Sequence, residues 1–249
     1  MSRPSRDSPR VLLVQIRQPD DPMGAHELGC VTRRVGDDVA LSSRNIFEES
    51  PTQAWLDECD GMILGGSGDY SVHDPRSAPW VNQLRRLLDL VLDQSHPTFG
   101  ICFGHQLLAY HLGAPVNTDA NHAELGTTTV DLTDEGRNDP VFGRYPNTFH
   151  VHTGHSDHVS ETPKELVLLA SNAALETQAF RVKGASFYST QFHPDLCGIE
   201  AMDRYVAYHR SLRPLEDDQA PPSNLFRPNL DESATLIRQF LDKFAFNTG

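Results

Sequence analysis

Cys102 is the first residue in the chain whose surroundings indicate chemistry. It has a glycine two positions away on each side, follows a strand-like run from Thr98 to Ile101 and precedes a helical run from Gln106 to Leu112. This arrangement is typical of a nucleophile elbow, a strained strand-to-helix turn whose small neighbours avoid the reactive side chain. The N-terminus of the helix would stabilise a thiolate, and the amide of Phe103 would face a bound carbonyl oxygen. A buried structural cysteine in a tight turn is the alternative.

A histidine and an aspartate two positions apart could supply the base that a thiol nucleophile requires. His193 and Asp195 follow the last strand-like run, Ser186 to Phe192, and Pro194 fixes the backbone between them. A histidine can take the thiol proton when a carboxylate orients its ring. Because the chain has 12 histidines, such a pair also arises by chance as a loop histidine beside a solvated acid. Its combination with the elbow is what indicates a catalytic triad.

Three glycines upstream of the elbow could complete an oxyanion hole. Gly65, Gly66 and Gly68 follow a strand-like run from Gly61 to Leu64. A loop at the end of a second strand can supply the other amide of such a hole, and we expect that amide to be Gly66. The run lacks the GK[ST] ending and the G-x-G-x-x-G spacing of phosphate-binding loops. A plain turn is the remaining alternative.

Four segments together resemble a class I glutamine amidotransferase domain of the stand-alone glutaminase type, similar to the amidotransferase domain of GMP synthase. They are GICFGHQ around Cys102, QFHPD around His193, the turn from Leu64 to Gly66, and His155 to Asp157. They occur in the family's order between Val11 and Asp195, which is most of the chain. The resemblance implies an α/β fold, a three-layer sandwich around a mostly parallel, flavodoxin-like central sheet.

The resemblance also implies a reaction and a site. The side-chain amide of glutamine would be hydrolysed through a cysteinyl γ-glutamyl thioester, with release of ammonia. Cys102 would be the nucleophile, His193 the base and then the acid, and Asp195 the orienting acid. The backbone of Gly66 and Phe103 would form the oxyanion hole. The substrate-binding residues would be Gly65, Gln106, His155, Ser156 and Asp157.

The chain departs from the family's usual pattern at two positions. The family usually has glutamate where this chain has Asp195, and proline where it has Ser67. Aspartate is shorter by one carbon–carbon bond, about 1.5 Å, whereas proton transfer needs heavy atoms about 2.6–3.2 Å apart. Either the local backbone compensates for the shorter side chain, or the orientation of His193 is weakened.

The elements that must position these residues follow an α/β pattern. Val11 to Ile16 predicts a buried strand near the sheet centre, and apolar residues between Pro79 and Ser95 fall at helical spacing. Alternating strands and helices up to Leu112 indicate a largely parallel sheet. Later strand-like runs predict a partly antiparallel part of the same sheet: Gly126 to Leu132, Thr148 to His152, Leu166 to Ala170, Thr177 to Val182 and Ser186 to Phe192.

The two ends of the chain carry further expectations. Residues 1–10 are expected to be flexible, and four prolines between Arg213 and Pro228 predict an irregular excursion. Leu230 to Phe246 predicts a closing amphipathic helix with Asp231 and Glu232 in its first turn. Since no internal repeat is present, we expect the 249 residues to form a single domain.

Composition argues against several classes of protein. The formal charge of −13 argues against partners such as nucleic acid or an anionic membrane, which would need a basic stripe. No apolar run reaches the length of a transmembrane helix, and the N-terminus lacks the apolar stretch and cleavage site of a signal peptide. Four widely spaced cysteines without a CxxC favour a reducing, cytoplasmic location. We expect no cofactor.

A run of histidines has a spacing that a metal site could use: His150, His152, His155 and His158. We expect no metal there, because the strand is predicted to end near Gly154. In the resembling family, this segment lies beside the amino and carboxylate groups of the substrate. The cysteines without an elbow are expected to be packing residues: Cys30, Cys59 and Cys197.

The acceptor of the reaction stays open between different classes of protein. About fifty residues follow Asp195, too few for a synthase domain, so an amidotransferase of this kind would need a separate synthase subunit for its partner. A free-standing γ-glutamyl hydrolase or peptidase would use the same Cys-His-Asp chemistry on a γ-glutamyl compound, with water as acceptor. A non-catalytic module is disfavoured because nucleophile and base are both present. The pairs Ser71-Val72 and Pro79-Trp80 match stand-alone members of the family and favour a free-standing enzyme whose acceptor and substrate they do not identify.

Overall fold

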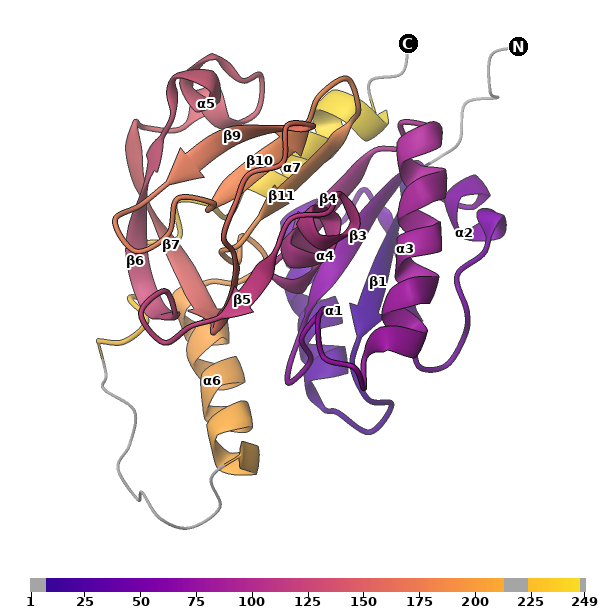
Figure 1. The fold of residues 1–249 in the computed structure, drawn as a ribbon, viewed down its shortest axis with the longest axis horizontal. Coiled ribbons are helices and arrows are strands. Elements are labelled where there is room, and N and C mark those ends of the chain that lie inside the picture. The colour runs from indigo at the N-terminus through magenta and orange to yellow at the C-terminus, as the bar shows by residue number, and fades with distance from the viewer. Residues whose placement is uncertain (1–7, 213–223, 247–249) are drawn as a thin grey trace.

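The computed structural model describes residues 8–212 and 224–246 of the 249-residue chain. Within these residues a nine-stranded sheet has the order β2-β1-β3-β4-β11-β10-β9-β6-β7. Strands β2, β1, β3, β4 and β11 are mutually parallel. Antiparallel pairs extend the sheet from β11 through β10, β9 and β6 to β7. Helices cover both faces (Figure 1), so the predicted three-layer α/β fold is confirmed.

The strands of the large sheet have the following bounds: β1 Arg10–Ile16, β2 Ala40–Asn45, β3 Gly61–Ser67, β4 Thr98–Ile101, β6 Glu124–Leu132, β7 Thr148–His155, β9 Leu166–Ser171, β10 Ala179–Val182 and β11 Phe187–Thr190. A small second sheet pairs β5 (Val116–Thr118) with β8 (Asp157–Val159). The helices are α1 Met23–Val35, α2 Gln53–Asp57, α3 Ala78–Asp93, α4 Phe103–His111, α5 Asp134–Asn138, α6 Gly198–Leu212 and α7 Leu236–Leu241. A 3-10 turn spans Phe142–Arg144, and a π-helical turn, Asp242–Phe246, continues α7.

Strand β1 shows how the two cores form on either side of the sheet. Val11 and Leu13 pack in the cluster that contains residues of α1 and α7. Leu12 and Val14 pack in the cluster that contains residues of α2, α3 and α4. Successive side chains of a strand point to opposite faces, and helices cover both, so the whole run is apolar. The expected position near the sheet centre is wrong, because β1 is second from the edge, beside β2.

The order of the parallel strands determines where a site can form. β2, β1, β3, β4 and β11 follow the flavodoxin-like order, with β11 in the fifth place. The carboxyl ends of parallel strands meet at one edge, where ligands bind in such folds. β3, β4 and β11 are adjacent and end at Ser67, Ile101 and Thr190. The sheet therefore brings the segments that follow these three strands to the same edge.

The C-terminal helix is shorter than the sequence predicts. α7 begins at Leu236 rather than Leu230, and residues 232–235 form a turn. Asp231 and Glu232 do not lie in its first turn. Their carboxylates instead contact ring nitrogens of His152, at 2.9 Å, and His150, at 2.8 Å, on β7. These long-range contacts replace the stabilisation that acids give at a helix N-terminus.

The predicted irregular segments are only partly described. Residues 1–7 and 213–223 lie outside the described residues, whereas Arg10 already opens β1 and residues 224–230 form turns and bends. Helix α6 lies outside the elements expected from the sequence; it projects beneath the strands in Figure 1 and packs against α1 and β7.

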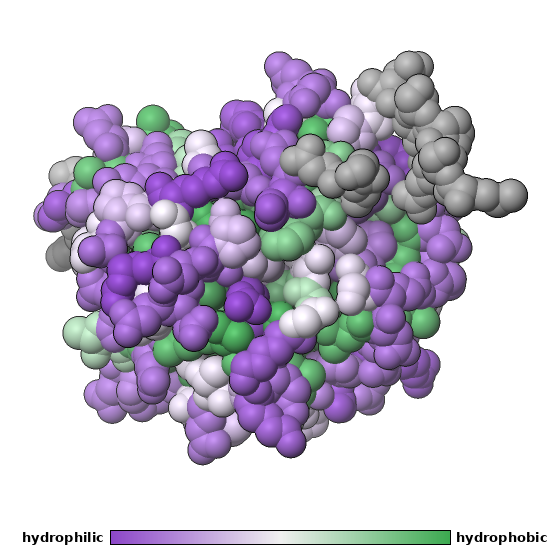
Figure 2. Space-filling model, turned by 90° about the horizontal axis from the view of Figure 1, so that it is seen from above, coloured by the Kyte–Doolittle hydropathy of each residue, from purple (hydrophilic) through white to green (hydrophobic). Residues whose placement is uncertain are grey.

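The end of the molecule opposite α6 is mainly polar. Seen from that end, hydrophilic side chains cover most of the surface, and hydrophobic ones show in narrower strips between them (Figure 2). Among the described residues, no helix is both long and apolar enough to span a membrane.

Candidate active site

Cys102 lies in the sharp turn between β4 and α4 that the sequence predicts. Its backbone has φ 50° and ψ −94°, in the positive-φ region that non-glycine residues rarely adopt. A Cβ on Gly100 would lie 2.9 Å from the Gly104 carbonyl, and one on Gly104 would lie 2.6 Å from the Leu64 carbonyl oxygen. Both distances are shorter than real Cβ contacts allow, so the two glycines permit β3, β4 and α4 to approach closely. The Cys102 amide donates to the Thr190 carbonyl on β11 at 2.8 Å, which ties the turn to the next strand.

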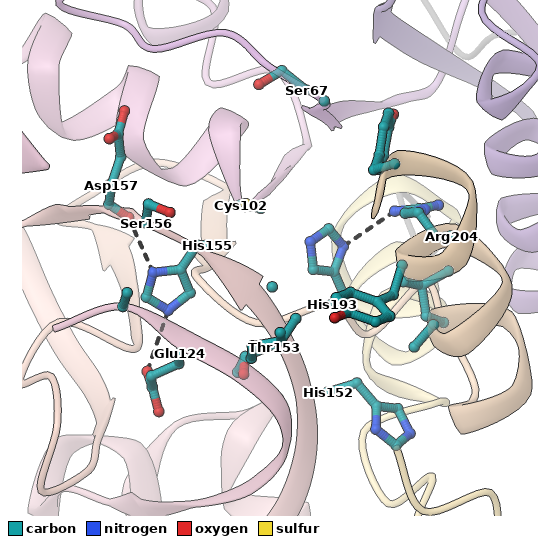
Figure 3. Close-up of a pocket in the computed structure, with 18 of the residues that line it drawn as sticks. Ser67, Cys102, Glu124, His152, Thr153, His155, Ser156, Asp157, His193 and Arg204 are labelled. Carbon is teal, nitrogen blue, oxygen red and sulfur yellow. Dashed lines mark hydrogen bonds and ion pairs between the residues drawn. The ribbon is translucent and has the colours of Figure 1, made fainter. Parts of the chain in front are cut away.

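His193 and Asp195 follow β11 and are both buried. The His193 Nδ1 atom lies 3.0 Å from Asp195 Oδ1, so the shorter acid still reaches the ring. The backbone amide of His193 donates to the His152 carbonyl on β7 at 2.8 Å, which holds the segment that follows β11. On the far side of the carboxylate, Arg204 Nη2 donates to Asp195 Oδ2 at 3.2 Å. Figure 3 shows Arg204 reaching the His193 ring from α6.

The electrostatics of this group favour an ionised Asp195 and a protonated His193. Burial alone would lower the pKa of His193, but the Asp195 carboxylate and the Cys102 sulfur raise it to about 9. Burial alone would raise the pKa of Asp195, but His193 and Arg204 hold it well below its usual range. An imidazolium next to Cys102 is the arrangement that stabilises a thiolate.

Gly66 lies directly against the proposed nucleophile and base. A Cβ at this position would be 3.3 Å from His193 Cε1 and 3.9 Å from the Cys102 Cβ. β3 pairs with β4 as far as Leu64, and its register with β1 shifts between Val14 and Ile16, opposite the two glycines. Phe103 is the first residue of α4, where backbone amides have no partner within the helix. The backbone of both expected oxyanion residues therefore borders Cys102.

Two glutamines fix the surroundings of the Cys102 sulfur. Gln191 Nε2 donates to Cys102 Sγ at 3.6 Å and accepts, through its Oε1, a hydrogen bond of 3.2 Å from Gln106 Nε2. Gln106 also donates to the Asp157 carbonyl at 2.8 Å. The sequence-predicted Gln106 and Asp157 are thus linked to each other and, through Gln191, to Cys102.

A cavity of about 770 Å³ opens beside Cys102 and His193. It is lined by residues 67–71, 123–125 and 152–157, by Cys102, Gln106, His193, Leu196 and Phe226, and by Ala201, Arg204, Tyr205 and Tyr208 of α6. Figure 3 shows His155, Ser156, Asp157 and Glu124 on one side of it, and His193 and Arg204 on the other.

His155 is fixed on the side of the cavity away from α6. Its Nε2 lies 3.2 Å from Glu124 Oε2 and its Nδ1 lies 3.1 Å from the Asp157 carbonyl oxygen. Burial alone would raise the pKa of Glu124, but hydrogen bonds from His155, Asn172 and Gln178 keep it below its ordinary value. A buried carboxylate therefore lies behind the His155 ring.

The histidines of the 150–158 run have separate partners. His150 contacts Glu232, His152 contacts Asp231, and His155 contacts Glu124. His158 stacks on His122 with ring centroids 4.6 Å apart. Among the described residues, no group of three or more His, Cys, Asp or Glu side chains could hold a metal ion.

Most, but not all, of the sequence-predicted site residues meet at the cavity. Cys102, Gln106, His193 and the segment from His155 to Asp157 line it. Asp195 lies behind His193 and does not line it. Gly65 does not line it either, because it faces inward, where a Cβ would be 2.9 Å from a Glu27 carboxylate oxygen.

Three residues of the site were not predicted from the sequence: Gln191, Glu124 and Arg204. Gln191 belongs to the QFHPD motif, but the motif alone does not indicate its contact with Cys102. Arg204 lies on α6, and the apolar spacing of residues 198–212 is the sequence signal that would have indicated this helix. Glu124 had no signal in the sequence, since its position depends on pairing between β6 and β7.

An aromatic cluster supports the loop that follows β3. Tyr70, which lines the cavity, packs against Phe47 and Trp80 with ring centroids 5.2 and 5.4 Å apart. Trp80 in turn packs against Phe103, the residue after Cys102, with ring centroids 5.5 Å apart. The Pro79-Trp80 pair noted in the sequence therefore joins α3, this loop and the elbow.

The chain is similar to proteins of one family over most of its length. The family model described as Glutamine amidotransferase class-I matches residues 33–207. A glutamine-hydrolyzing GMP synthase subunit of Thermoplasma acidophilum is 31% identical over 170 residues, covering 68% of this chain and 74% of that protein. The corresponding GMP synthase subunit of Saccharolobus solfataricus is 37% identical over 159 residues, covering 62% of this chain and 79% of its own length.

Solved structures agree with the fold. A glutamine amidotransferase from Thermotoga maritima superposes with a TM-score of 0.74 at 21% identity, covering 97% of this chain and 99% of the other, which at that identity shows the fold alone. A putative GMP synthase subunit from Thermoplasma acidophilum superposes with a TM-score of 0.63 at 25% identity, covering 84% and 98%.

Proposed function

This chain belongs to the class I glutamine amidotransferase family, and from that premise we propose that it hydrolyses the side-chain amide of glutamine through a cysteinyl γ-glutamyl thioester. The observation that carries the proposal is the meeting of Cys102, on its positive-φ turn, with the His193–Asp195 pair at the edge of the sheet. The ammonia released would serve an acceptor bound elsewhere.

The proposed reaction has two stages, in which the thioester first forms and is then hydrolysed. The Cys102 thiolate attacks the amide carbon, and the amides of Gly66 and Phe103 stabilise the oxyanion that forms. Protonated His193 then gives its proton to the leaving nitrogen, so that the C–N bond breaks, ammonia leaves and a thioester remains. A water molecule, deprotonated by His193, attacks the thioester and releases glutamate and the thiolate. Asp195 keeps the imidazole oriented throughout.

Recognition of the glutamyl group is assigned to the side of the cavity away from α6. His155, Ser156 and Asp157 line that side together with the buried Glu124. Carboxylates there suit the substrate's ammonium group, and the polar groups of His155 and Ser156 suit its carboxylate. We propose that Gln106 and Gly65 contribute indirectly, since Gln106 holds the Asp157 carbonyl and Gly65 makes room for Glu27 beneath β3.

The proposal includes a partner, a domain and a location. The relatives are named as one subunit of a glutamine-hydrolyzing GMP synthase, which supports a separate synthase subunit that accepts the ammonia. Hydrophobic clusters on both faces of one sheet support treating residues 1–249 as a single amidotransferase domain. The four cysteines are free thiols, which suits the cytoplasm.

A free-standing γ-glutamyl hydrolase is the second candidate, and the size of the cavity favours it. About 770 Å³ is within the range that encloses drug-sized ligands and exceeds what a single amino acid fills. The side towards α6 is lined by Leu196, Ala201, Tyr205 and Phe226, which would accommodate a leaving group larger than ammonia.

Steady-state turnover of the purified chain tests both candidates. Ammonia release from glutamine is expected, and it should vanish in Cys102→Ala. Cleavage of a γ-glutamyl dipeptide should be much slower. Fast dipeptide cleavage with negligible glutamine turnover would reject the first candidate in favour of the second, and cleavage of neither by the chain, with or without a synthase partner, would reject both.

A further inference from the structure

We propose that Arg204 is a positioning residue, which orients His193 by holding the Asp195 carboxylate from α6. This inference rests on the proposed function, because it concerns the same nucleophile and base. Arg204 has no role in the sequence motifs, and it reaches the site from an element that follows them. Its side chain is 8% exposed and that of Asp195 is 2% exposed, so the contact is shielded from water.

The two oxygens of Asp195 have different partners. Oδ1 lies 3.0 Å from His193 Nδ1, and Oδ2 accepts from Arg204 Nη2 at 3.2 Å. A carboxylate held at both oxygens cannot rotate about its last bond without losing one contact. Because aspartate has one rotatable bond fewer than glutamate, the arginine leaves it a single productive orientation. A positively charged partner also keeps the buried carboxylate ionised, as an acceptor.

The same contacts determine which ring nitrogen of His193 carries a proton. An ionised carboxylate only accepts hydrogen bonds, so Nδ1 of His193 carries a proton and donates to Asp195. Arg204 Nη1 lies 3.4 Å from Nδ1. Since both of these nitrogens are donors, this approach is a packing contact rather than a hydrogen bond, and it limits rotation of the ring towards α6. Nε2 is then the atom left to exchange protons with Cys102 and the substrate.

Arg204 is itself held in place by the face of α6 on which it lies. Glu200, Arg204 and Tyr208 are spaced by four and share one face of the helix. Glu200 pairs with Arg33 and Arg34 of α1 at 2.6 and 2.7 Å. The Tyr208 hydroxyl accepts a hydrogen bond from Arg17, which follows β1.

Glu200 also accepts from the Cys197 amide at 2.7 Å, at the start of the same helix. The contacts before and after Arg204 therefore fix the helix against α1 and the end of β1. Arg204 therefore reaches Asp195 from a helix that is held in place by contacts before and after the arginine.

Arg204 also lines the cavity, so it could instead bind a carboxylate of the substrate. The two roles differ in what they change. A positioning role acts on the chemical step and lowers kcat, whereas a substrate contact made equally in ground and transition states raises KM.

The test compares Arg204→Met and Arg204→Lys with Arg181→Met. Arg181 pairs with Asp139 at 3.1 Å, away from the cavity, and is a control for loss of a comparable arginine–aspartate pair. With glutamine as substrate, Arg204→Met should lower kcat about 10- to 100-fold with little change in KM, by analogy with groups that orient metal-binding histidines. Arg204→Lys, which keeps one charged donor, should recover part of the loss, and Arg181→Met should leave kcat unchanged.

A second measurement does not depend on the substrate. The rate at which iodoacetamide alkylates Cys102 reports the thiolate that His193 stabilises. We expect Arg204→Met to slow this alkylation, and millimolar guanidinium ion to restore it in Arg204→Ala, with sodium chloride at equal ionic strength giving no recovery. If glutamine is not the substrate, these alkylation results still hold, so failure of the proposed function is distinguishable.

Three outcomes would overturn the positioning role. A raised KM with unchanged kcat would make Arg204 a substrate contact. Equal losses of kcat in Arg204→Met and Arg181→Met would show that the Arg204–Asp195 ion pair only stabilises the fold. Unchanged kcat and unchanged alkylation in a folded Arg204→Met would show that Asp195 orients His193 without it.

Discussion

At the scale of single residues, Asp195 shows that an aspartate in place of the usual glutamate still contacts the His193 ring. The sequence raised the question whether aspartate reaches the ring that glutamate usually orients in this family, and the 3.0 Å contact with His193 answers it. The answer could not be read from the sequence, because it depends on the turn after β11, which the His152 carbonyl on β7 holds. Cys102 and His193 lie in local motifs that can be read from the sequence, whereas Arg204 approaches them only through the fold.

Cys102 should be the cysteine that reacts with a γ-glutamyl-like electrophile. Burial raises the pKa of Cys30 and Cys59 to about 12, so neither is a thiolate at neutral pH. Cys102→Ala should abolish hydrolysis and leave the melting temperature nearly unchanged. Mass spectrometry of the labelled protein is the measurement, and even labelling of Cys30, Cys59, Cys102 and Cys197 would contradict the assignment.

Substitution of His193 should lower kcat more than substitution of Asp195. His193→Asn should lower kcat about as much as Cys102→Ala, since nucleophile and base act as a unit. The loss of kcat in Asp195→Asn should be about 10- to 100-fold smaller than in His193→Asn, because an orienting acid does not touch the substrate. Steady-state kinetics on the two variants checks this. A silent Asp195→Asn would mean that another acid orients the ring.

The raised pKa of His193 should make the stability of the protein depend on pH in a defined window. A histidine protonated in the folded state with a pKa of about 9, against about 6.5 when unfolded, contributes stability fully below pH 6.5. That contribution is lost as the pH rises through 9. The difference in melting temperature between the wild type and His193→Asn should therefore shrink between pH 6 and 10. A constant difference would show that the imidazolium is not stabilised.

At the scale of elements, the glycines of the elbow matter because β3, β4 and α4 nearly touch. Gly104→Ala should destabilise the protein by about 1–3 kcal/mol, since its Cβ would collide with backbone that cannot move aside. Gly24→Ala is the matched control, because it lies in α1 with nothing within 4 Å of the added carbon, and it should stabilise by about 0.5–1 kcal/mol. Thermal unfolding measures the stability of both variants. Equal changes in stability would contradict the close approach of β3, β4 and α4.

Elements were predictable where their signal was local. The strands β3 and β4 and the helix α3 follow directly from apolar runs, glycines and prolines. The C-terminal helix was predicted too long because Asp231 and Glu232 looked like first-turn acids, whereas the histidines of β7 bind them. Local sequence does not show whether such acids lie in the first turn of a helix or contact a distant strand.

At the scale of the whole molecule, the acceptor of the ammonia decides how the isolated chain behaves. If a separate synthase receives it, glutamine hydrolysis should be slow for the chain alone and rise when the synthase is added, because a gated site does not waste ammonia. The measurement is kcat for glutamine with increasing synthase at saturating substrate. Full turnover in isolation, unchanged by the synthase, would favour the free-standing hydrolase.

The placement of β11 has a consequence for how the protein folds. Cys102 follows the parallel strand β4 and His193 follows the neighbouring strand β11, yet strands β5 to β10 lie between them in the chain. The two halves of the site therefore meet only when a long loop of chain has closed and β11 has docked beside β4. Contacts so distant in sequence form late and slowly. A partly folded chain holds Cys102 without His193 beside it, so under the proposed function hydrolysis should appear only when β11 docks during refolding.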